Sequence, residues 1–73
     1  MSDARQAITA AEAADADRYA ATTLADARRY LAEAETLLRN EAYGAARINA
    51  VRAKNRAVRA LVISQSAAEA EPD

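Results

Sequence analysis

Five basic side chains stand within residues 45–60, and no acidic residue accompanies them. They are Arg47, Arg52, Lys54, Arg56 and Arg59. Basic groups on one helix can hold the phosphates of nucleic acid or of anionic lipid head groups. Arg52, Arg56 and Arg59 fall on one flank at helical spacing, so we take them as the candidate anion-binding residues. The chain has a net charge of −1, however, and its acidic segments repel a polyanion, which disfavours nucleic acid.

The same charges have a simpler interpretation, in which they solvate the helix and pair with acidic residues of the preceding helix. Glu33, Glu35 and Asp26 are the expected partners. Each exposed pair of this kind contributes about 0–1 kcal/mol to stability.

Catalytic chemistry finds no support in the sequence. Cysteine and histidine are absent, which removes the thiolate nucleophile, the commonest general base and the commonest metal ligand. Glu33 and Glu35 are two residues apart on a helix and point to different faces, while Asp15 and Asp17 lack the spacing of a calcium loop. We predict no catalytic residue, no metal site and no cofactor, and therefore no enzyme.

The elements that must position these residues are helices. The chain holds one glycine and one proline, it is rich in alanine, and nothing alternates with period two. The spacing predicts helices over about 3–15, 22–39 and 42–65, with Asn40-Glu41 as a connection short enough to bring the last two back antiparallel. We predict an all-α, three-helix up-down-up bundle dominated by this helical hairpin.

The predicted ends follow from local signals. Asp3 with Gln6 resembles a capping box, and Thr23 with Asp26 makes a second side-chain cap. Residues 1–66 form a single helical domain in this prediction, and the polar residues 67–73 form an acidic frayed tail.

The last predicted helix has two opposed apolar stripes. Ala46, Ala50, Ala53, Ala57 and Ala60 form one, and alanine lets the helix of residues 22–39, with its seam of Leu24, Ala27, Leu31, Ala34 and Leu38, approach closely. The other stripe needs a second cover, which the first helix can supply only in part because Ile8 is its one large apolar residue. We predict a partner-binding face made of Ile48, Val51, Asn55, Val58, Val62 and Ile63.

Asn55 has two interpretations within that face. It sets the register of a helix–helix interface as a single buried amide, or it lies at the exposed margin of the stripe.

The core that this sequence can build is small. The chain has 73 residues, and most of its apolar fraction is alanine, which buries little surface. We therefore predict marginal stability for an isolated monomer, which a protein partner, a second copy or a neighbouring domain would relieve.

The spacing resembles a known family. The positions that carry the likeness are Ala10, Ala13 and Ala16, Tyr19-Ala20, the seam of Leu24, Ala27, Leu31, Ala34 and Leu38, and Tyr43, Ala46, Ala50, Ala53 and Ala57. Their pattern is similar to the alanine-rich domain of unknown function found in Gram-negative envelope lipoproteins, sometimes ahead of an OmpA-like domain. The likeness covers roughly residues 4 to 60. Ala16 with Tyr19-Ala20 resembles the family's Gly-Ala then Tyr-Ala-Pro signature, with Asp15 and Ala21 in place of the glycine and the proline. A second likeness is to half of a tetratricopeptide unit.

The resemblance implies a periplasmic location or the periplasmic face of the outer membrane, a scaffold or interaction role, and tethering through a removed lipoprotein leader. A native start at Met1 would instead indicate the cytoplasm. No apolar run of about 18 residues, the length of a spanning helix, occurs in the sequence.

Overall fold

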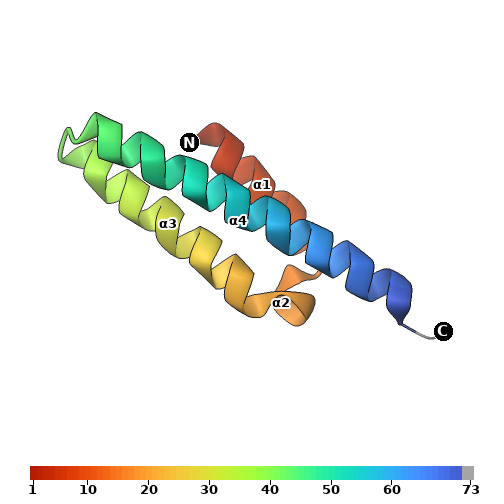
Figure 1. The fold of residues 1–73 in the computed structure, drawn as a ribbon. Coiled ribbons are helices and arrows are strands. Elements are labelled where there is room, and N and C mark those ends of the chain that lie inside the picture. The colour runs from red at the N-terminus through yellow and green to blue at the C-terminus, as the bar shows by residue number, and fades with distance from the viewer. Residues whose placement is uncertain (72–73) are drawn as a thin grey trace.

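Four helices make up the part of the chain that the structure describes, residues 1–71 of a computed structural model (Figure 1). They are α1 (Ser2–Ala13), α2 (Ala16–Tyr19), α3 (Ala21–Arg39) and α4 (Tyr43–Ala70). No strand occurs among the described residues, so the predicted all-α class is confirmed. The segment between the first two predicted helices, 3–15 and 22–39, contains the single helical turn α2, which the hydrophobic period did not indicate because only four residues form it.

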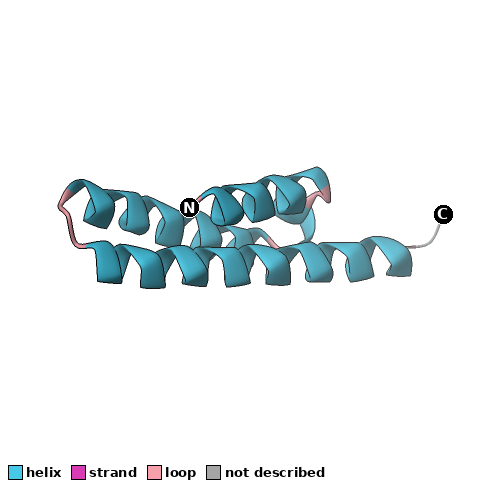
Figure 2. Cartoon of the chain, turned by 90° about the horizontal axis from the view of Figure 1, so that it is seen from above, coloured by secondary structure: helices cyan, strands magenta, loops and turns pink. Residues whose placement is uncertain are grey.

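The fold is a long helical hairpin with a shorter helix beside it. α3 and α4 run antiparallel and share the most extensive contact, as predicted (Figures 1 and 2). The molecule is a rod of 50 × 17 × 14 Å. α1 lies along α4 and touches α3 at few places, so this packing establishes the hairpin but not a closed three-helix bundle.

Alanine forms the contact face of α4, as the sequence indicated. Ala53, Ala57 and Ala60 are fully buried, Ala46 is buried and Ala50 is half-buried. Leu24, Ala27 and Ala34 of α3 are buried opposite them, and α1 adds Ala4, Ile8 and Ala11. A methyl group is the largest side chain that lets helix backbones approach this closely, so the core is built mainly from methyl groups.

The loop end of the hairpin is less covered than the predicted leucine seam implied. Leu31 is half-buried against the core, but Leu38 is exposed. α1 has 12 residues, α3 has 19 and α4 has 28. At about 1.5 Å per residue, α1 is too short to reach the end of α3 where Leu38 lies.

The helix ends differ from those predicted. α1 and α3 begin at Ser2 and Ala21 without a side-chain cap, so Asp3 and Thr23 lie inside the first turn, and both predicted caps are wrong. Packing of the buried faces, with Ala4 and Ile8 in α1 and Leu24 and Ala27 in α3, stabilises these helices without such caps.

α4 also continues to Ala70, past the predicted end near 65. Ser64 is fully buried, and its hydroxyl donates to the Ala60 carbonyl oxygen at 2.7 Å, so this serine sits in the helix instead of ending it. Residues 67–70 of the predicted tail are therefore helical, while 72 and 73 lie outside the described residues.

Two residues with a Cβ adopt left-handed backbone conformation at the chain reversals. Asp15 and Glu41 both have φ of 62°. After α3, the Glu41 N–H donates to the Leu38 carbonyl and the Ala42 N–H to the Leu37 carbonyl, at 3.0 and 2.9 Å. This pair of bonds is the Schellman motif, in which glycine normally occupies the position of Glu41.

The alanine contact predicts a sharp difference between two substitutions in α4. Ala57→Leu should lower the free energy of unfolding by about 1–3 kcal/mol, because three carbons must enter a filled interface. Ala45→Leu, at an exposed position of the same helix, should change it by less than about 0.5 kcal/mol. Urea unfolding followed by circular dichroism measures both, and equal stability of the two variants would refute the close contact.

The Schellman motif predicts a gain in stability from glycine. Glu41→Gly should raise the free energy of unfolding by about 0.5–1 kcal/mol, because relief of the left-handed strain exceeds the added entropy of the unfolded chain. Glu41→Ala keeps the Cβ and serves as the control, with stability close to that of the parent chain. Thermal and urea unfolding check the pair, and a glycine variant no more stable than the alanine variant would contradict the assignment.

Candidate interaction surface

An apolar stripe runs along the outer side of α4, opposite the alanine face. Ile48, Val51, Val58 and Val62 have between 44% and 55% of their surface exposed. Four branched aliphatic side chains with this exposure, aligned on one helix, form an apolar strip instead of scattered surface residues, and the polar side chain of Asn55 interrupts it. We call these four residues together with Asn55 the outer stripe.

The neighbouring helices leave the outer stripe uncovered. We expected the first helix to cover part of it, and this expectation is wrong: α1 packs against the alanine side of α4, where Ala4, Ile8 and Ala11 are buried. A helix offers two opposed faces, and α1 and α3 share the one lined with alanine because only that face allows close approach.

The predicted partner-binding residues fall on the stripe with one exception. At about 100° per residue, the outer stripe occupies one arc of α4, with exposed Asn55 in its middle. Ile63 lies outside this arc, among the arginines, and is 37% exposed. Leu61, its neighbour, turns inward and packs on the core.

Basic side chains border the outer stripe on both sides. Arg52 and Arg59 lie exposed along one edge, and Arg47 and Lys54 lie exposed along the other. Arg56, the third residue of the predicted anion-binding set, is half-buried and lies farther round the helix than Arg52 and Arg59. The structure therefore places two of the three predicted anion-binding residues beside the stripe.

The acidic residues expected to pair with these charges are occupied elsewhere. Glu35 pairs with Arg5 of α1, while Asp26 and Glu33 lie 3.6 and 3.7 Å from Arg29 of α3 itself. The predicted pairing with α4 is therefore wrong, because partners on the same helix or on α1 are nearer. Within residues 1–71 the one ion pair of this basic segment joins Lys54 to Asp3, at 3.8 Å.

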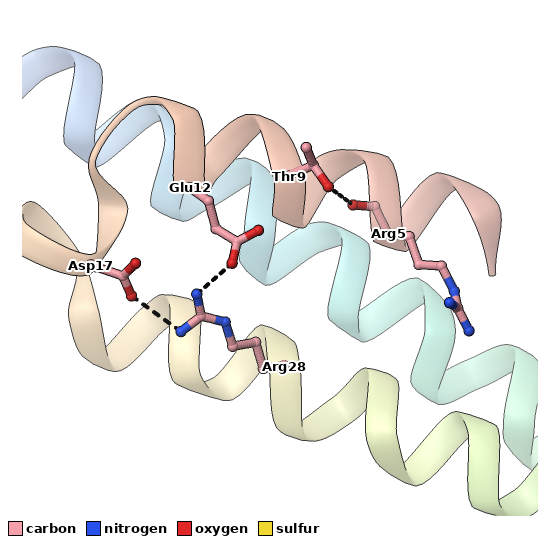
Figure 3. Close-up of polar contacts among 5 residues, drawn as sticks. All are labelled: Arg5, Thr9, Glu12, Asp17 and Arg28. Atoms are coloured by element: carbon pink, nitrogen blue, oxygen red, sulfur yellow. Dashed lines mark hydrogen bonds and ion pairs between the residues drawn. The ribbon is translucent and has the colours of Figure 1, made fainter.

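The remaining ion pairs lie around α2. Arg28 of α3 reaches Glu12 of α1 at 2.6 Å and Asp17 of α2 at 3.1 Å (Figure 3). The guanidinium of Arg28 thereby links three helices. The hydrogen bonds to Glu12, the larger influence, and to Asp17 raise the pKa of Arg28. Arg18 pairs with Glu71 at 2.9 Å, and a hydrogen bond to Glu71 raises the pKa of Tyr19.

Basic and acidic side chains are strongly separated along the chain. Residues 45–60 carry five basic side chains, and the rest of the sequence carries five basic and eleven acidic ones. Arginines of α1, α2 and α3 neutralise many of those acids locally, so the positive charge of α4 is left facing solvent around the outer stripe.

A groove of about 460 Å³ adjoins the stripe at its N-terminal end. Met1, Ala4 of α1, Leu38 of α3 and Tyr43 of α4 line it, together with Arg47, Val51, Lys54 and Asn55. Leu38 and Tyr43 were not predicted as site residues, and Leu38 was expected in the seam that packs against the last helix. Both side chains are exposed because α1 is too short to cover this end of the hairpin. The hydrophobic pattern alone does not predict where α1 ends relative to α3 and α4.

Residues 1–71 contain neither a metal-binding cluster nor a membrane-spanning helix. No group of three or more acidic, histidine or cysteine side chains is placed to hold a metal ion there. None of the helices described is both long enough and apolar enough to cross a bilayer.

The fold and surface define a small all-α module that presents one apolar helix face bordered by basic residues. A family model described as a domain of unknown function, DUF4398, matches residues 1–72, and the chain belongs to this family. No curated protein and no solved structure matches the chain.

The turn around α2 gives a conformational explanation for the signature that the chain resembles. Asp15 stands where the signature has glycine, and its φ of 62° is the backbone conformation that glycine adopts most easily. Ala21 stands where the signature has proline and is the first residue of α3, a position at which proline is favoured. At both positions the structure thus shows a requirement of backbone geometry.

Proposed function

We propose that this chain is a non-catalytic interaction module that binds another protein through the outer stripe of α4. The observation that carries the proposal is the exposure of Ile48, Val51, Val58 and Val62 on one arc of a well-formed helix. Burying each of these side chains fully would contribute roughly 1.5–3 kcal/mol relative to full exposure, and about half of that is still available to a partner.

The small core supports the same proposal. Among the large apolar side chains of residues 1–71, Leu24 alone is fully buried, and most of the remaining core is alanine. A partner that binds the folded chain adds stability in proportion to its affinity and concentration. The three long helices would act as one up-down-up unit that holds α4 straight and presents its outer side.

The resemblance described above adds a location to the proposal. By that likeness the module works in the bacterial cell envelope, in the periplasm or at the periplasmic face of the outer membrane. It would act there as a scaffold that a lipoprotein tether anchors to the membrane. Self-association is one form of binding that the stripe could serve.

Site-specific cross-linking tests the surface. A photo-reactive residue at position 62 should give protein adducts in extracts of the source cells, and Val51→Glu should abolish them because it puts a charge into the apolar strip. The same residue at position 25, exposed on α3, is the control and should give none. Adducts that persist in Val51→Glu, or that form equally from position 25, would refute the outer stripe as the binding surface.

An alternative function rests on the arginines that lack an acidic partner within residues 1–71. In this proposal Arg52, Arg56 and Arg59 bind an anionic polymer, either nucleic acid or an acidic lipid surface. The alternative predicts binding to an oligonucleotide or to acidic vesicles that weakens steeply with ionic strength and is lost when all three arginines become glutamine. Fluorescence anisotropy and vesicle sedimentation measure it, and no detectable binding at low salt would end this alternative.

A further inference from the structure

The outer stripe has the spacing of a coiled-coil seam. Ile48, Val51, Asn55, Val58 and Val62 follow one another in steps of three, four, three and four residues, which places Ile48, Asn55 and Val62 at position a of a heptad and the two valines at position d. Figure 2 shows α4 as a straight, unbroken helix, and all five residues are exposed on it. The seam spans two heptads, about 20 Å of helix.

The positions that flank the seam are basic on both sides. Arg47 and Lys54 occupy position g, and Arg52 and Arg59 occupy position e. In coiled coils these positions set the choice of partner through charge. Lys54 shares its charge with Asp3 at 3.8 Å, and the three arginines have no acidic partner within residues 1–71.

A second copy of the chain is the wrong occupant for this seam. In a parallel pair, Arg47 would face Arg52 of the other copy, and Lys54 would face Arg59. In an antiparallel pair, position g faces g and position e faces e, so basic groups again meet basic groups. Like charges at these positions destabilise the pair, and both orientations carry them.

A lipid surface fits the seam less well than a helix. Helices that lie on membranes have a broad apolar face with tryptophan, phenylalanine or leucine. The outer stripe is narrow, consists of branched aliphatics, and has the amide of Asn55 at its centre. A single amide at position a is a feature of helix–helix seams, where it fixes register.

We propose that the outer stripe binds one amphipathic helix of another protein, whose apolar seam is flanked by acidic residues and carries a polar residue opposite Asn55. This inference rests on the proposed function and adds the chemistry of the partner. The acidic flanks would pair with Arg47 and Lys54 on one side and with Arg52 and Arg59 on the other.

Two synthetic peptides test the inference on the full chain. The acidic probe has three heptads with isoleucine at a, leucine at d, one asparagine at a, and glutamate at every e and g. The basic probe is identical except for lysine at every e and g. We expect the acidic probe to bind at least about ten times more tightly by fluorescence anisotropy at low salt, and to lose most of this advantage in half-molar NaCl.

One substitution separates seam packing from simple charge attraction. Val58→Lys adds positive charge, so attraction alone would tighten binding of the acidic probe, whereas loss of the apolar contact should weaken it about tenfold or more. Ala25→Lys on exposed α3 makes the same charge change away from the seam and should leave affinity unchanged. Circular dichroism confirms that both variants are folded.

A second variant tests the flanks without touching the apolar contact. Arg52→Glu with Arg59→Glu should shift the preference from the acidic probe toward the basic one. If both probes bind equally, and both are lost in Val58→Lys, the apolar surface of the proposed function stands and the acidic partner is overturned. If Val58→Lys affects neither probe, the proposed surface itself fails.

Two further outcomes identify a different occupant. Sedimentation equilibrium that shows dimers abolished by Val58→Lys would overturn the inference in favour of a second copy. Binding to phosphatidylglycerol vesicles in the absence of any binding to the acidic probe would overturn it in favour of a lipid surface.

Discussion

The close approach of α4 to α3 and α1 along a line of alanines is the constraint on which the rest of the structure depends. Ala53, Ala57 and Ala60 have no exposed surface, and a larger side chain at any of them would separate the helices. Because a methyl group buries little surface, this contact is stabilised by its length and by dispersion between closely packed atoms more than by large apolar residues. The hairpin therefore becomes a thin rod with little room for branched side chains inside it.

The composition of the outer face follows from that constraint. The branched aliphatic side chains of α4 do not fit into an alanine contact, so they lie on the opposite side of the helix and stay exposed. Packing against α3 and α1 holds α4 itself in place. Charge is divided in a similar way. Acidic residues of α1, α2 and α3 pair with nearby arginines, as Glu12 and Asp17 pair with Arg28. The basic side chains of α4 lie exposed on both sides of the apolar strip. The alanine face of α4 thus stabilises the fold, and the opposite face of the same helix provides the exposed apolar and basic surface.

The sequence predicts the parts of this fold that depend on periodicity. The alanine stripe and the position of the outer stripe follow from which residues recur every three or four positions, and the antiparallel hairpin follows from the short connection between its two periodic segments. The exposure of Leu38 could not be predicted in the same way, because it depends on where α1 ends in space. The ion pairs were also misassigned: Glu33 and Asp26 are as close in sequence to Arg29 as helical pairs can be, and a local partner costs less side-chain entropy than a distant one.

The heptad spacing of the outer stripe was visible in the sequence, but its meaning required the structure. An a/d pattern on a helix normally marks the face that packs within the chain. Here the chain packs with alanines instead, so the pattern remains unused by the fold. Of the basic side chains on its flanks, Lys54 pairs with Asp3, and Arg47, Arg52 and Arg59 have no acidic partner within residues 1–71. Under the proposed function, a surface with the spacing of a helix–helix seam and basic groups on both flanks would favour a helix of another protein over a second copy of this chain. The polar amide of Asn55, which lowers the apolar character of the strip, would then fix the register of that helix at the expense of affinity.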